Sequence, residues 1–173
     1  MILFKIHGLS WLFVILFTIP SLVLAQNIQT IKVALTYNFA KYTQWPHSDT
    51  VSEFNFCYFS DTYTKDFEKI VHKKIKTQNI STVLIEDISD LGQCNVVYVG
   101  AAAEPKINAI LSAVKNKAIL TVSNVPDFTN LGGMIELVLV NNKLRFKVNM
   151  KEILNSQLKM SSHVLKLAID VKR

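Results

Sequence analysis

The sequence predicts one α/β domain: a three-layer sandwich with a mixed, mostly parallel sheet, an antiparallel C-terminal hairpin and helices on both faces. Short, continuously apolar segments such as Ala118–Val122 alternate with segments of helical periodicity, a pattern typical of parallel strands covered on both faces. Further along, two apolar segments flank Asn141 and Asn142, residues that tolerate positive φ and favour a tight antiparallel turn. A chain of 173 residues without repeats or a Pro/Gly/Ser linker indicates a single domain.

The first 25 residues have the layout of a secretory signal peptide. Lys5 lies in a short n-region, an apolar run follows, and a small-x-small pattern ends at Ala25. We therefore expect cleavage after Ala25, a mature chain of residues 26–173 and a location in the periplasm. A transmembrane anchor is the alternative, but Pro20 interrupts the run and the stretch is short for a full span.

The order of elements follows from changes in hydrophobic period along the mature chain. Apolar spacing from Ile28 to Tyr42 predicts a first helix, which ends before Trp45-Pro46 because the residue before a proline is displaced from helical backbone angles. The elements expected after it are a strand at 54–59, a helix at 63–74, strands at 82–85 and 94–99, a helix at 105–114, a strand at 118–122, strands at 134–140 and 143–149, a helix at 151–157, and a helix from Ser161 or Ser162 through Val171.

The two asparagines also predict the register of the hairpin. A two-residue turn at this point aligns the strands residue by residue and turns alternate side chains to opposite faces. The register pairs Val140 with Lys143, Val138 with Arg145 and Glu136 with Lys147, and it directs Leu144, Phe146 and Val148 to the core.

Cys57 and Cys94 are expected to form a disulfide. Pairing is the default in an exported chain, and both lie in predicted strands that a parallel sheet can place side by side, within the ~5.5 Å Cα separation that a disulfide requires. Two buried free thiols are the alternative.

The chain lacks the patterns of the common catalytic and metal sites. Its four histidines have no ligand spacing, and it has no Gly-x-Ser-x-Gly, no phosphate-binding glycine loop and no Cys-x-x-Cys. We therefore expect no catalytic residues, no metal and no cofactor. A protein that acts by binding, and not an enzyme, is the expectation.

Basic residues concentrate at the C-terminal end. The whole chain has a net charge of +6, and residues 143–173 contain eight Lys or Arg against Glu152 and Asp170. Such a bias favours acidic protein surfaces or anionic lipid headgroups, although a solvated face is the commoner meaning of scattered lysines. Nucleic acid is not expected as a partner, because basic and aromatic residues are not interleaved.

Four residues are candidates for contact with a partner: Trp45, Glu136, Arg145 and Lys147. Trp45 ends an aromatic-rich helix, where such residues form either core or an interface anchor. Arg145 and Lys147 point away from the core in the predicted register, so with Glu136 they form either cross-strand ion pairs or a polar contact surface. The aromatic helix also leaves apolar surface that one small sheet does not cover, which predicts a homodimer or docking to another protein.

Several segments together resemble the YfiR/HmsC family, and they span nearly the whole mature chain. Residues 34–46, ALTYNFAKYTQWP, are similar to the family's aromatic-rich opening helix, and residues 94–100, CNVVYVG, to its Cys-led central strand. The remaining similarities are LTVS at 120–123, Phe128, GGMI at 132–135, LRFKVN at 144–149, LKMSS at 158–162 and LKLA at 165–168.

The resemblance implies that residues 26–173 form a YfiR-like regulatory domain. Such a domain binds the periplasmic domain of an inner-membrane diguanylate cyclase and represses it, thereby lowering cyclic di-GMP and biofilm formation. A further implied partner is an outer-membrane lipoprotein that sequesters the repressor. Family members often carry a second cysteine pair, and its absence here argues against a two-disulfide redox switch.

A periplasmic small-molecule-binding sensor is the alternative function. An α/β sheet offers a crevice at the carboxyl ends of its parallel strands, here near Gly100–Ala103 and Ser123-Asn124. A deep pocket with convergent polar groups at that edge would favour this alternative.

Overall fold

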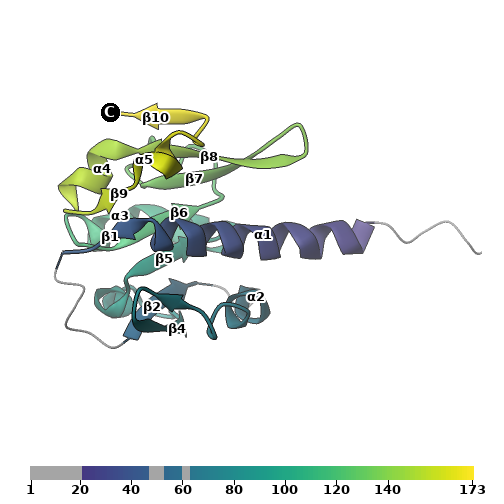
Figure 1. The fold of residues 1–173 in the computed structure, drawn as a ribbon, viewed down its shortest axis with the longest axis horizontal. Helices are drawn as coiled ribbons and strands as arrows, with labels where there is room; N and C mark the ends of the chain where they lie inside the picture. The colour runs from purple at the N-terminus through teal and green to yellow at the C-terminus, as the bar shows by residue number, and fades with distance from the viewer. Residues whose placement is uncertain (1–20, 47–52, 60–62) are drawn as a thin grey trace, which may run out of the picture.

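A computed structural model of the chain describes residues 21–46, 53–59 and 63–173, and Figure 1 shows the arrangement of its elements. The elements, in chain order, are α1 (Ser21–Lys41), β1 (Thr43–Gln44), β2 (Glu53–Tyr58), α2 (Thr64–Glu68), β3 (Lys74–Ile75), β4 (Gln78–Leu84), the 3-10 helix η3 (Ile88–Gln93), β5 (Val96–Val99), the 3-10 helix η4 (Ala101–Lys106), α3 (Ile107–Val114), β6 (Leu120–Ser123), β7 (Ile135–Val140), β8 (Lys143–Asn149), α4 (Met150–Asn155), β9 (Lys159–Met160), α5 (Ser162–Leu165) and β10 (Asp170–Lys172).

The main sheet has eight strands in the order β10-β8-β7-β6-β5-β2-β4-β3. Neighbouring strands from β4 to β7 are parallel, as is the pair β8 and β10, whereas β3 runs antiparallel to β4 and β7 antiparallel to β8. Every residue of the central strands β5 and β6 is buried, as parallel strands covered on both faces require. The predicted α/β class with a mostly parallel sheet and an antiparallel C-terminal hairpin is confirmed.

Helices cover both faces of the sheet and divide the core into two clusters. On one face α1 crosses the strands, and its Phe39 packs edge-on against Phe146 of β8 with ring centroids 4.8 Å apart (Figure 1). On the other face α3 packs against Val97 and Val99 of β5. The helix contributes Ile107, Ile110 and Val114 to this second cluster. The layers are therefore helix, sheet and helix.

The C-terminal hairpin has the predicted register. Asn141 and Asn142 both have positive φ, 48° and 58°, as a tight two-residue turn of this hand demands. Val140 pairs with Lys143, Val138 with Arg145 and Glu136 with Lys147, and Phe146 and Val148 are buried with Leu144 packed partly against the same core.

The helix predicted at 63–74 is wrong over its second half. α2 ends at Glu68, and the chain then forms β3, which pairs antiparallel with β4 through a turn in which Lys76 has positive φ. Ile70 is buried, so its hydrophobic spacing is real, but it is buried from a turn and not from a helix. Pairing at the sheet edge outweighed the local helical period.

The closing helix is also shorter than predicted. Ser161 caps α5 as expected, its side chain accepting a hydrogen bond from the His163 amide, but the helix ends at Leu165. The chain then turns so that the Ile169 amide donates to the Phe146 carbonyl at 3.0 Å, and β10 adds to β8 in parallel. Leu167 and Ile169, which follow the end of the helix, are largely exposed.

Smaller differences concern the boundaries of elements. The strand predicted at 82–85 begins at Gln78, and the helix predicted from Pro105 is preceded by a 3-10 turn, η4, with α3 beginning at Ile107. A two-stranded ladder of β1 and β9, not predicted, joins the end of α1 to the C-terminal region. The predicted signal peptide, residues 1–25, lies mostly outside the described residues. Its last five residues, Ser21–Ala25, form the start of α1.

Cys57 and Cys94 are bonded to each other, with their Cα atoms 5.8 Å apart. Cys57 lies in β2 and Cys94 directly before β5, its neighbour in the sheet, and both are buried against α3. The alternative of two free thiols is therefore wrong for this structure.

Reduction of this disulfide should lower the free energy of unfolding by about 4 kcal/mol, because the bridge closes a 37-residue loop in the unfolded chain. Urea unfolding with and without reductant measures the difference. A Cys57→Ala, Cys94→Ala double variant is the control, since its stability should not respond to reductant. Two titratable thiols in unreduced, denatured protein would contradict the bridge.

Candidate functional site

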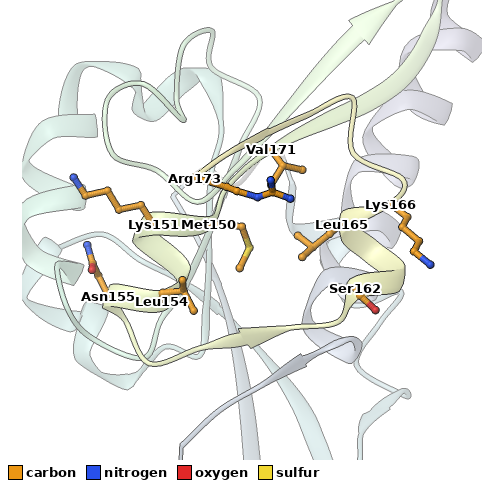
Figure 2. A pocket seen from close by; sticks show the side chains of 9 residues that line it. All are labelled: Met150, Lys151, Leu154, Asn155, Ser162, Leu165, Lys166, Val171 and Arg173. Carbon is orange, nitrogen blue, oxygen red and sulfur yellow. The ribbon is translucent and has the colours of Figure 1, made fainter.

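An open apolar groove of about 650 Å³ lies at the C-terminal end of the fold, between α4, α5 and β10. Figure 2 shows Met150 and Leu165 pointing toward the centre of the groove from α4 and α5, with Leu154 below them. Leu154 is 62% exposed, and together with Met150 and Leu165 it forms contiguous apolar surface. Val171 of β10 completes the apolar lining.

Basic side chains surround this groove. Lys151 and Lys166 extend away from it on opposite sides, and Arg173 lies across it between the two helices (Figure 2). All three are exposed, and within the described residues none of them makes an ion pair. The polar side chains of Asn155 and Ser162 complete the lining. The groove therefore has an apolar floor and a positive rim.

Local sequence explains why α4 and α5 hold the groove open. Asn149 caps α4 by accepting a hydrogen bond from the Glu152 amide at 3.3 Å, and Ser161 caps α5. Each short helix buries one apolar residue in the main core, Ile153 from α4 and Val164 from α5. The remaining apolar side chains of the two helices then face one another across the groove.

Glu136 lies on β7 beneath the loop that precedes it and is 2% exposed. Its carboxylate accepts hydrogen bonds from Lys147 Nζ at 3.0 Å, from the Thr129 hydroxyl at 3.0 Å and from the Thr129 amide at 3.3 Å. Burial alone would raise the pKa of Glu136, but the hydrogen bonds from Lys147 and Thr129 outweigh it and lower that pKa. The Glu136 carboxylate is therefore buried and hydrogen-bonded within the protein, and it is not exposed to a partner.

The two cationic candidates on β8 differ in their surroundings. Lys147 is half-buried and paired with Glu136, whereas Arg145 is exposed and faces solvent. Of the charged residues predicted for partner contact, Arg145 is thus the accessible one. None of Trp45, Glu136, Arg145 and Lys147 lines the apolar groove.

Trp45 lies at the amino-terminal edge of the parallel strands, directly after β1. Its ring packs edge-on against Phe54 with centroids 4.9 Å apart, and the indole nitrogen is buried with no hydrogen-bond partner among the described residues. It lines a separate cavity of about 450 Å³ beside Cys94 and Asn95. Trp45 is half-buried, intermediate between the core and anchor roles considered for it.

The carboxyl edge of the strands, where the sequence predicts a solute crevice, is filled by aromatic side chains at Gly100 but keeps a cavity of about 370 Å³ beside Ala102 and Ala103. The Tyr63 ring packs on Tyr98 and lies over Gly100 so closely that a Cβ there would fall 2.5 Å from a Tyr63 ring carbon. Tyr98 donates to Asn124 at 2.8 Å, and burial raises the pKa of its phenol, which keeps it a donor. Ser123 is likewise occupied, donating to the Val99 carbonyl at 2.7 Å.

Among the described residues, no group of three or more His, Cys, Asp or Glu side chains is arranged to hold a metal ion. No helix in the described part of the chain is long and apolar enough to cross a membrane.

Comparisons with known proteins agree with the architecture. The family model described as YfiR/HmsC-like matches residues 29–169, most of the chain. A search of curated proteins finds no match.

Several solved structures have a similar fold, and two of them illustrate the likeness to this chain. One is an ABC domain in complex with L-Trp from Streptococcus pneumonia, with a TM-score of 0.56 and 11% identity over 83% of this chain and 60% of that one. The other is a conserved domain protein from Vibrio cholerae, with a TM-score of 0.50 and 10% identity over 86% of this chain and 60% of that one. The chain thus spans about 60% of the length of each, and at such identity the likeness shows the fold alone.

Lys147→Met should lower the free energy of unfolding at neutral pH by about 2 kcal/mol, because it leaves the Glu136 carboxylate buried without its cation. Arg145→Met, on the same strand but exposed, is the matched control and should change stability by less than about 0.5 kcal/mol. Urea unfolding of the three proteins measures both effects.

The pH dependence gives a second check on the same pair. The pKa of Glu136 is lowered in the folded protein, so its carboxylate contributes stability above the unfolded-state pKa, and this contribution is lost as the pH falls through the folded-state pKa. The deficit of Lys147→Met should therefore shrink on acidification. A deficit that stays constant down to the acid transition would contradict the pairing.

Proposed function

Because the chain belongs to the YfiR/HmsC-like family, we propose that it binds and represses an inner-membrane diguanylate cyclase, thereby lowering cyclic di-GMP and biofilm formation. The family consists of periplasmic regulators of cyclic di-GMP signalling, and the family match over residues 29–169 is the observation that carries the proposal. A buried disulfide fits the oxidising periplasm. The partner in this proposal is the cyclase's periplasmic domain.

Repression must then operate through binding. The family is regulatory and non-catalytic, and the sequence lacks the patterns of the common catalytic sites. A binding protein shifts an enzyme to an inactive state only if it binds that state more tightly than the active one, because equal affinity shifts nothing. The proposal therefore requires a surface with differential contacts, for which the structure offers an apolar groove and an exposed Arg145.

A small-molecule sensor is the second function considered. The carboxyl edge of the sheet favours it less than the sequence suggested, because Tyr63, Ser123 and Asn124 are engaged in packing or internal hydrogen bonds there. A cavity of about 370 Å³ does lie at this edge, and its charged lining residues are Glu86 and Lys106. Partner binding remains the better-supported proposal.

Two additional partners belong to the same proposal. An outer-membrane lipoprotein would sequester the repressor and so release the cyclase, and a homodimer would be the form in which the repressor acts. Light scattering that gives only the monomer mass at micromolar concentration would count against the homodimer and leave the cyclase interaction open.

Deleting the gene should raise cyclic di-GMP and surface attachment, because the cyclase loses its repressor. A second deletion, of each membrane diguanylate cyclase with a periplasmic domain, identifies the partner as the one whose loss cancels the phenotype. Complementation with the Phe146→Ala variant, which loses packing at the core and should be destabilised by about 3 kcal/mol or more, serves as a folding-defect control. Unchanged cyclic di-GMP in the deletion strain would refute the repressor function.

A further inference from the structure

We propose that the groove between α4, α5 and β10 is the docking site for one segment of the cyclase's periplasmic domain: an apolar side chain or short apolar stretch flanked by acidic residues. The inference rests on the proposed function and adds to it the surface and the chemistry of the partner segment.

The apolar floor is the first argument. Leu154 is 62% exposed although Met150 and Leu165 lie beside it, so that the groove leaves contiguous apolar surface in water. Covering such a leucine removes apolar surface from water, which favours association. The groove is concave, so it accepts a protruding side chain, which is how interface anchors are normally held.

The charge of the rim is the second argument. Lys151, Lys166 and Arg173 surround the floor, and the described structure supplies no acidic side chain to neutralise any of them. They belong to the C-terminal segment 143–173, which carries eight basic residues against two acidic ones. Acidic residues that flank an apolar anchor would pair with such a rim and would steer the encounter between the proteins.

Charge disfavours one other occupant of the groove, and shape disfavours a second. A second copy of this chain seated groove to groove would bring identical basic rims face to face, because a twofold interface uses the same patch on both protomers. A membrane carries anionic headgroups, but it is a broad surface that meets protruding side chains more readily than the recessed Met150 and Leu165. An acidic protein segment matches both the shape and the charge.

The test compares two exposed leucines of the same C-terminal segment. Leu154 lines the groove and is 62% exposed, whereas Leu167 does not line it and is 60% exposed. Leu154→Glu should weaken binding to the purified periplasmic domain of the genetically identified cyclase by about tenfold or more, while Leu167→Glu stays within about twofold. Isothermal titration calorimetry measures both affinities, and thermal melting of each variant confirms that it folds.

A pair of double variants tests the rim in the same way. Lys151→Glu with Lys166→Glu should lower the affinity and the association rate, and the rate should respond less to salt than in the wild-type protein. Lys65→Glu with Lys143→Glu makes the same change in net charge at exposed sites away from the groove. It should retain most of the affinity if the position of the charge, and not its sum, decides binding.

The outcomes separate this inference from the function on which it rests. Wild-type protein that fails to bind the cyclase domain overturns both. Wild-type protein that binds equally with Leu154→Glu overturns the groove and leaves the repressor function standing. Loss of self-association in Leu154→Glu, or loss of flotation with phosphatidylglycerol-rich vesicles, without loss of cyclase binding assigns the groove to a second copy or to the membrane and overturns the proposal.

Discussion

The position of β8 is the constraint on which the C-terminal half of the molecule depends. It pairs antiparallel with β7 on one side and parallel with β10 on the other. One face of the strand supplies Phe146 to the core beneath α1, and the other supplies Lys147 to the buried Glu136 carboxylate. The strand then leads directly into α4, so the groove is placed by the same register that fills the core.

The hairpin could be predicted from sequence because its determinants are local. Asn141 and Asn142 define the turn, the turn defines the register, and the alternation of Leu144, Phe146 and Val148 defines the face. The early end of the closing helix could not be predicted from sequence, because no residue near Leu167 signals that the Ile169 amide will donate to the Phe146 carbonyl. The competing contact lies more than twenty residues upstream, and a helical period of apolar residues does not distinguish a helix from a turn that leads to an edge strand.

The candidate site shows the same limit in another form. The sequence shows an excess of basic residues at the C-terminal end, and this excess includes Lys151, Lys166 and Arg173 at the rim of the groove. The groove itself could not be predicted from the sequence, because its floor combines side chains from α4, α5 and β10. The sequence predicts a helix where β10 lies. The alternation of side chains in the hairpin correctly predicts that Arg145 and Lys147 lie off the core. It does not show that Thr129, in the loop before β7, hydrogen-bonds to Glu136 and buries it beside Lys147.

The walls of the groove are tied to both halves of the fold, and this bears on the proposed docking of a partner segment. β9 runs between α4 and α5 and pairs with β1, which directly follows α1, and the Ser161 amide donates to the Tyr42 carbonyl at 2.9 Å. The two groove helices are thus connected through backbone hydrogen bonds to the long helix that crosses the sheet (Figure 1). A groove held in this way requires little ordering when a partner docks, so that more of the contact energy remains available to discriminate between the partner's conformations. Such discrimination is what repression by binding requires.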